Sequence, residues 1–182
     1  MDNTLIEHLC AGNRRYLAGQ AAGDVSEAIR RETAENGQHP KAIVIACSDS
    51  RVIPEAIFNA GIGELFTIRV AGNVLDRHQL GSIEYAAAHL HCPLILVLGH
   101  TGCGAVGAAL TGHGEGYIRY ITDEIQKAIG EETDPDAACR LNVLHAVERI
   151  RGAFREHPEI PSAELEVRGA VYDIRSGEVV WL

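Results

Sequence analysis

The sequence lacks any long apolar run. No stretch approaches the roughly 20 apolar residues that a helix needs to cross a bilayer, so we expect no membrane partner. The N-terminus also lacks the apolar core of a secretory signal, because it carries Asp2, Glu7, Arg14 and Arg15. The two absences predict a chain that is neither anchored in a membrane nor exported.

Basic residues are scarce relative to acidic ones. The chain has 16 Lys and Arg against 25 Asp and Glu, a formal net charge of −9. No block of Lys and Arg offsets this balance locally. Nucleic acid and anionic membrane surfaces are therefore poor candidates as partners.

Cysteine is present, but not in the pattern of a disulfide framework. An odd number of cysteines is scattered through a chain of ordinary domain size: Cys10, Cys47, Cys92, Cys103 and Cys139. This usage fits a reducing compartment, and hence a cytoplasmic location, better than it fits a disulfide-stapled protein. It leaves thiols available as metal ligands.

The composition and the apolar pattern indicate one α/β domain, residues 1–182, with 46% hydrophobic residues. Apolar runs predict strands at 42–46, 64–70 and 94–98, followed by a terminal hairpin at 167–174 and 179–182. Helical spacing predicts helices at 2–18, 26–35, 81–90, 105–110, 117–130 and 136–155. This alternation predicts an open, mostly parallel sheet flanked by helices, with the first two helices as an N-terminal arm.

Metal-binding residue types follow two of the predicted strands. Cys47 comes directly after strand 42–46, and His100 and Cys103 come just after strand 94–98. Sites in open parallel sheets form beyond the carboxyl ends of the strands, so these three side chains are expected to meet. Two thiols and an imidazole are ligands that zinc prefers, and three protein ligands leave the fourth position open, as in catalytic zinc sites.

Asp49 and Arg51 stand beside the first of these ligands. Two thiolates and a neutral imidazole cancel the charge of Zn²⁺, so a bound water needs help to ionise. Asp49 can accept a hydrogen bond from that water. Arg51 can hold Asp49 in a bidentate pair and keep it off the metal.

Each element alone has a plainer interpretation. An isolated cysteine at a strand end is more often a small core residue, and an isolated Asp-x-Arg pair is more often a surface ion pair. The segment Gly99–Gly104 also has glycines, but it lacks the order of a phosphate-binding loop. The combination of the two motifs, rather than either one, carries the metal hypothesis.

At these residues the chain closely resembles the β-class carbonic anhydrases. The shared motifs cover most of the chain: Ala46–Val52, Gly63–Arg69, Ala71–Asn73, Ser82–Tyr85, Leu98–Ala105 and Gly169–Asp173. The resemblance implies a four-stranded parallel sheet with an added edge strand. It also implies zinc on Cys47, His100 and Cys103, and an assembly based on a homodimer, which can build a tetramer.

The resemblance also implies a substrate pocket shared between two subunits. Gln38, Phe66 and Tyr85 would line it from the neighbouring subunit, and Gly104 would leave room for CO₂. From patterning alone, Phe66 and Tyr85 would instead be assigned to core packing.

Two positions depart from the family pattern. Val70 replaces an Asn that often follows the strand arginine, and we expect little effect on zinc. Val44 stands where some bacterial members carry a Trp that builds an inhibitory bicarbonate pocket, so Arg69 and Tyr172, which match its other two residues, are not expected to complete it. We therefore expect Asp49 to pair with Arg51 at neutral pH and to bind the metal only in a closed form.

The leading hypothesis is reversible hydration of CO₂ to bicarbonate and a proton by attack of zinc-bound hydroxide. Three alternatives stay open at this point. The same scaffold could hydrolyse CS₂ or COS, which comparison of turnover on the three gases would distinguish. The chain could be a non-catalytic zinc-binding or thiol regulatory module, or it could use Cys47 as a nucleophile in metal-independent sulfur transfer.

Overall fold

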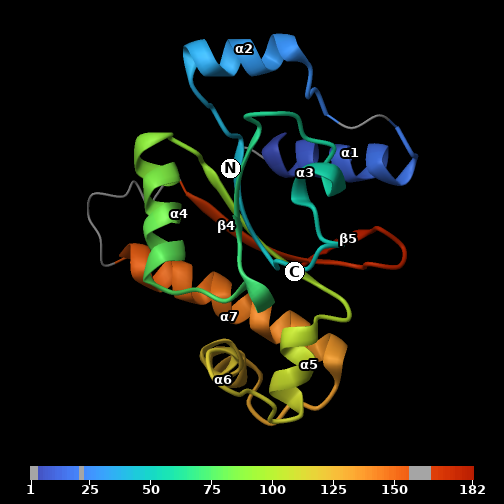
Figure 1. Ribbon diagram of the computed structural model, residues 1–182, viewed down its shortest axis with the longest axis vertical. Coiled ribbons are helices and arrows are strands. Elements are labelled where there is room, and N and C mark those ends of the chain that lie inside the picture. The colour runs from blue at the N-terminus through green and yellow to red at the C-terminus, as the bar shows by residue number, and fades with distance from the viewer. Residues whose placement is uncertain (1–3, 21–22, 156–164) are drawn as a thin grey trace.

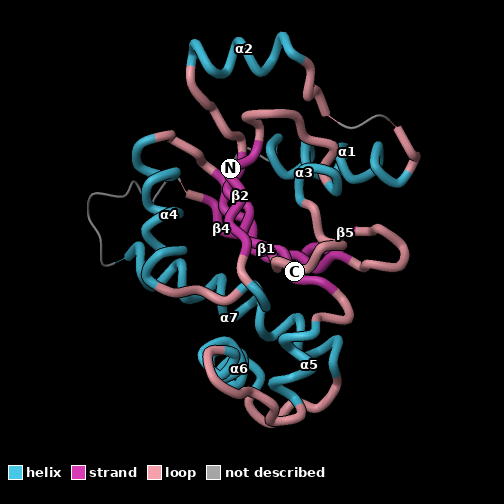
Figure 2. Tube along the Cα trace, in the orientation of Figure 1, coloured by secondary structure: helices cyan, strands magenta, loops and turns pink. Residues whose placement is uncertain are grey.

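The sheet has five strands in the order β2-β1-β3-β4-β5. The computed structural model describes residues 4–20, 23–155 and 165–182 of the chain. The parallel strands are β1 (Ala42–Ala46), β2 (Leu65–Arg69), β3 (Leu94–His100) and β4 (Glu166–Tyr172), and β5 (Val179–Trp181) runs antiparallel to β4 at one edge. Figure 2 shows the strands bundled through the centre of the molecule. The predicted parallel sheet with an added edge strand is confirmed.

The helices surround this sheet (Figure 1). Their bounds are α1 (Thr4–Leu17), α2 (Glu27–Asn36), α3 (Pro54–Ile57), α4 (Arg77–His89), α5 (Gly104–Leu110), α6 (Ile118–Ile129) and α7 (Pro135–Arg155), with a short 3-10 helix η1 (Ala71–Asn73). No helix among the described residues is both long and apolar enough to span a bilayer. Within the described range, the N-terminal arm consists of α1 and α2, and the predicted start at residue 2 lies outside that range.

Every residue of β1 is apolar and buried, as expected for a central parallel strand whose two faces are both covered by helices. Ile43 shares an apolar cluster with Ile83 of α4 and Val143 of α7. Its neighbour Val44 faces the other way and shares a cluster with Leu9 of α1. The alternation of side chains along the strand thus creates two cores, with α4 and α7 over one face and α1 and α3 over the other (Figure 1).

Three predicted boundaries were wrong by two residues or more, one of them the end of β4, which lies at Tyr172 rather than at 174. Helix α4 begins at Arg77 rather than at 81, because the Asp76 carboxylate caps it and the Asp76 N–H in turn donates to Oε1 of Gln79. This capping box was legible in the sequence as Asp76-x-x-Gln79. Strand β3 continues past residue 98 to His100, because β4 pairs with it along its whole length.

The carboxyl end of β3 lies close under α7. Gly99 permits this approach, since a Cβ at that position would stand 2.5 Å from Cγ2 of Val143. Helices α5 and α6 pack beyond the same strand ends (Figure 1). The fold therefore brings α5, α6 and α7 around the rim where Cys47 and His100 emerge.

Candidate metal centre

Cys47, His100 and Cys103 meet at this rim. Their potential ligand atoms all lie within 4.8 Å of one another, and all three residues are buried. Cys47 follows β1, His100 ends β3, and the register Ala46–Leu98 places the two strand ends side by side. Cys103 is the N-cap residue of α5. The predicted meeting of the two motifs is confirmed.

The imidazole ring of His100 is oriented so that one ring nitrogen can bind a cation. Its Nδ1 donates to the carbonyl oxygen of Thr101 at 2.9 Å, since a carbonyl can only accept. Nε2 then carries the lone pair, and it is buried with no hydrogen-bond partner among the described residues. A buried polar atom without a partner is costly. A metal ion beside the two thiols would satisfy it, so the donor set fits zinc.

The two thiols share one proton, so their pKa values move in opposite directions. A hydrogen bond from Cys103 lowers the pKa of Cys47 to about 4, against the effect of burial, and the same sharing raises the pKa of Cys103. Burial works to lower the pKa of His100, but the Cys47 thiolate raises it overall. The three donors thus share protons within a buried site, and a divalent cation would displace those protons on binding.

Asp49 is fixed by Arg51. The Arg51 Nε donates to Oδ1 of Asp49 at 2.9 Å, and Nη2 donates to Oδ2 at 2.7 Å. The Arg51 backbone N–H adds a third bond at 2.9 Å. The guanidinium holds the pKa of Asp49 well below its usual range. The carboxylate is therefore ionised and turned toward Arg51, in the arrangement expected for the open form of the site.

Two further residues support Cys47, and sequence reasoning missed these roles. The Gly72 N–H donates to Cys47 Sγ at 3.3 Å. Arg69 donates from Nε to the carbonyl of Cys47 at 3.1 Å and from Nη2 to that of Asp49 at 2.7 Å. The sequence pointed to Arg69 only as a match to one residue of the family's inhibitory bicarbonate pocket. Here it braces the loop that carries Cys47 and Asp49.

Tyr172 also has a partner inside the chain. Its hydroxyl lies 3.0 Å from that of Tyr16 on α1, and burial raises the pKa of Tyr172 to about 12. Tyr172 is thus engaged with α1, and Val44 lies buried in β1.

The predicted substrate residues do not gather around Cys47 within one chain. Phe66 pairs with Ile43, four residues before Cys47 and hence about 13 Å away along the strand direction. Its ring lies 6.3 Å from that of Tyr85, which is half exposed on α4. Gln38 is exposed and precedes β1. Only Gly104 adjoins the metal ligands, and, apart from its chain neighbours and its own helix backbone, no described residue lies within 4 Å of where its Cβ would be.

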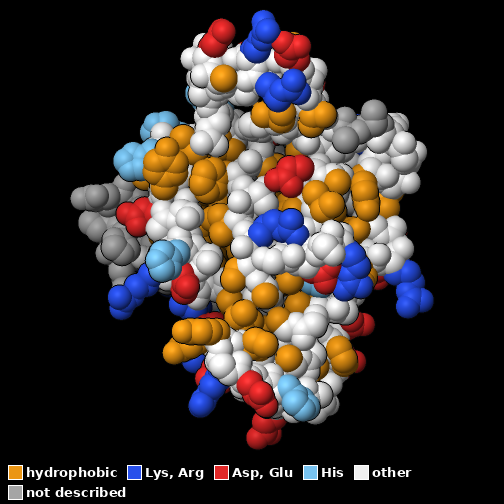
Figure 3. Space-filling model, viewed as in Figure 1, with side chains coloured by type: hydrophobic (Ala, Val, Ile, Leu, Met, Phe, Trp, Pro, Cys, Tyr) orange, Lys and Arg blue, Asp and Glu red, His pale blue; other side chains and the backbone are white. Residues whose placement is uncertain are grey.

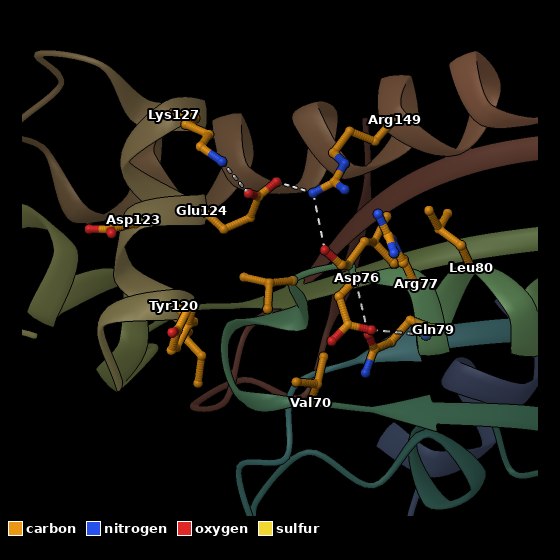
Figure 4. A pocket seen from close by; sticks show the side chains of 13 residues that line it. Val70, Asp76, Arg77, Gln79, Leu80, Tyr120, Asp123, Glu124, Lys127 and Arg149 are labelled. Atoms are coloured by element: carbon orange, nitrogen blue, oxygen red, sulfur yellow. Dashed lines mark hydrogen bonds and ion pairs between the residues drawn. The ribbon is translucent and has the colours of Figure 1, made fainter. Parts of the chain in front are cut away.

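A separate hollow of about 560 Å³ lies between the start of α4 and helices α6 and α7 (Figure 4). None of the three metal ligands lines it. Glu124 of α6 accepts from Lys127 at 2.8 Å and from Arg149 of α7, and Arg149 also donates to the carbonyl of Leu75 at 3.0 Å. Despite partial burial, these cations lower the pKa of Glu124. The network joins the segment after η1 to both helices.

The chain is similar to known proteins over nearly its whole length. The sequence model of the carbonic anhydrase family matches residues 42–179. "Carbonic anhydrase 2" of Mycobacterium tuberculosis is 42% identical over 182 residues, which cover 93% of this chain and 87% of that protein.

Solved structures show the same likeness. A β-carbonic anhydrase of the fungal pathogen Aspergillus fumigatus superposes with a TM-score of 0.70 at 27% identity, covering 97% of this chain and 90% of that one. One of two tetrameric β-carbonic anhydrases from the ascomycete Sordaria macrospora gives a TM-score of 0.68 at 26% identity, with 100% and 98% covered.

Proposed function

This chain belongs to the β-class carbonic anhydrases, and on that premise we propose that it uses zinc, held by Cys47, His100 and Cys103, to interconvert CO₂ and bicarbonate. The single observation that supports this most is the buried ligand cluster, in which the lone pair of His100 Nε2 faces two thiols and has no hydrogen-bond donor among the described residues. The overall reaction is CO₂ + H₂O ⇌ HCO₃⁻ + H⁺.

The three ligands suit this chemistry. When bound, zinc supplies a Lewis acid that lowers the pKa of a water and so provides a nucleophile near neutral pH. Two thiolates and one neutral imidazole balance the ion's charge, and the hydrogen bond from His100 Nδ1 to Thr101 fixes which ring nitrogen faces it. Three ligands leave a position for water, which a fourth ligand would close.

Asp49 then acts on the proton that this water carries. An ionised carboxylate only accepts hydrogen bonds, so Asp49 would accept a hydrogen bond from a water or hydroxide held there and would leave its lone pair free for the substrate. The Arg51 fork keeps Asp49 from turning onto the metal, which would give the closed form. Gly104, with open space at its Cα, leaves room for the substrate beside Cys103.

We propose further that the active site is completed by a second subunit. Gln38, Phe66 and Tyr85 are remote from the metal ligands of their own chain, and a homodimer would bring the partner's copies to them. Apolar side chains reach the surface across the middle of the face in Figure 3. Exposed large apolar residues of the described chain include Ile53 and Tyr85, consistent with a face covered in an assembly.

The direct test is metal removal and return. The purified protein is expected to hold about one zinc per chain, and dialysis against a chelator should abolish CO₂ hydration measured by stopped flow. Adding zinc should restore it. Full activity in metal-free protein would contradict the proposal. Stoichiometric zinc with no hydration from about pH 6 to 9 would identify a non-catalytic zinc protein instead.

Replacing Arg51 with lysine is expected to lower kcat/KM by about 10- to 100-fold while leaving zinc content unchanged. Lysine keeps the positive charge but cannot form the two parallel bonds to Asp49, so the carboxylate is no longer held in place. Stopped-flow hydration and metal analysis on the same sample measure both effects. Arg31→Lys is the matched control, because Arg31 pairs with Glu27 on exposed α2. Equal activity in the two variants would show that the Arg51 fork is dispensable.

A further inference from the structure

Gly72 contributes a backbone hydrogen bond to a metal ligand. Its N–H donates to Cys47 Sγ at 3.3 Å, and the residue has φ = 68°, in the left-handed region. A Cβ at this position would stand 2.8 Å from Cδ1 of Ile125 and 3.1 Å from Cβ of Ala105. Glycine is thus required here, but glycine also has the most backbone freedom of any residue. Something outside the residue must hold this N–H on the sulfur.

Asn142 of α7 is placed to do this. Its side chain is buried, with 4% of the residue exposed, and Nδ2 donates to the Gly72 carbonyl at 2.8 Å. The carbonyl and the N–H of Gly72 flank the same Cα, so fixing the first restrains the second. The result is a chain of hydrogen bonds from α7 through Gly72 to the thiolate of Cys47.

We propose that Asn142 is a positioning residue for the reaction, which holds the Gly72 N–H on Cys47 Sγ and thereby adjusts the electron density that this sulfur donates to the metal. The inference rests on the proposed function of the three ligands. Two thiolates donate enough charge to blunt a zinc ion's Lewis acidity. An N–H bond to one sulfur withdraws part of that charge and keeps the ion electrophilic.

A purely structural role for Asn142 makes a different prediction. The same segment is anchored to the same helix at a second point, where Arg149 donates to the Leu75 carbonyl (Figure 4). If these bonds only attach α7 to the segment, losing either one should cost stability and nothing else. If Asn142 also acts on Cys47, only its loss should change the metal–sulfur bond.

The test uses the full chain loaded with Co²⁺, whose sulfur-to-metal charge-transfer absorption reports on the electron density of the thiolates. Asn142→Leu keeps most of the side-chain volume but removes the donor. We expect its absorption band to move to lower energy, and kcat/KM of the zinc form to fall about tenfold, the lower end of the roughly 10- to 100-fold effect of outer-shell partners. The control Arg149→Met should lower the melting temperature without moving the band.

An unmoved band in folded Asn142→Leu would overturn the inference. If that variant is not recovered folded, Asn142→Ser, which is too short to reach the Gly72 carbonyl, replaces it and must show the same band shift. Failure of the proposed function gives a distinct result: a wild-type protein that binds Co²⁺ without any sulfur-to-metal band has no Cys47–Cys103 metal site, and both proposals are then wrong.

Discussion

Replacing Cys103 with serine is expected to abolish CO₂ hydration and zinc retention together. Cys103 lies at the N-cap of α5, and its sulfur is one of three atoms that meet within 4.8 Å. A serine hydroxyl is a poor zinc ligand, and it leaves only Cys47 and His100. The loss should exceed about 100-fold, because changes to partners outside the ligand shell already cost roughly 10- to 100-fold. Stopped-flow hydration and metal analysis measure it.

The control for this experiment is Cys92→Ser. Cys92 is equally buried, but it lies before β3, at the opposite end of the strand from His100. Burial raises its pKa to about 11, so it stays a neutral thiol. Its thiol makes a weak contact to the Leu94 carbonyl at 3.9 Å, which a serine hydroxyl can also approach. We expect zinc content and activity to remain. If Cys103→Ser retained stoichiometric zinc and full activity, the ligand assignment would be wrong.

The ligand cluster could be predicted from the sequence because it depends on local signals. Cys47 and His100 each come at the end of an apolar run, and parallel strands place such ends at one rim. Cys103 follows His100 closely enough to share the site. The Asp49–Arg51 pair is equally local, since one turn brings the two side chains together.

The supports of the cluster could not be predicted in this way. Asn142 and Gly72 are 70 positions apart, and nothing in the sequence around either one indicates their hydrogen bond. In the sequence, Arg69 looks like an ordinary strand residue. Its contact with the Cys47 loop depends on the pairing of β2 with β1, which places its guanidinium beside the Cys47 carbonyl. Tertiary packing decides these contacts. The start of α4 is a different kind of miss, because the Asp76–Gln79 capping box was visible and was overlooked.

The substrate residues pose a question about assembly: whether Gln38, Phe66 and Tyr85 act on the metal site of a partner. Subunit mixing answers it. We expect Cys103→Ser chains and Gln38→Ala chains to be nearly inactive alone, since one lacks a metal ligand and the other a pocket residue. A purified dimer with one chain of each kind should regain about half of the wild-type activity, because one of its two symmetric sites then has every part intact. Two different affinity tags allow that dimer to be isolated.

The reciprocal arrangement makes the test decisive. When both substitutions are placed on one chain and paired with a wild-type chain, the dimer contains the same altered residues in a different distribution. The intact Cys103 now faces a partner that carries the Gln38→Ala substitution, and the intact Gln38 faces a site without zinc, so neither site is complete. We expect this dimer to stay nearly inactive. If each site were instead built from a single chain, the wild-type chain would work unaided and the two results would be reversed. Activity that follows the distribution of the substitutions, rather than their number, therefore assigns Gln38 to the partner's metal site.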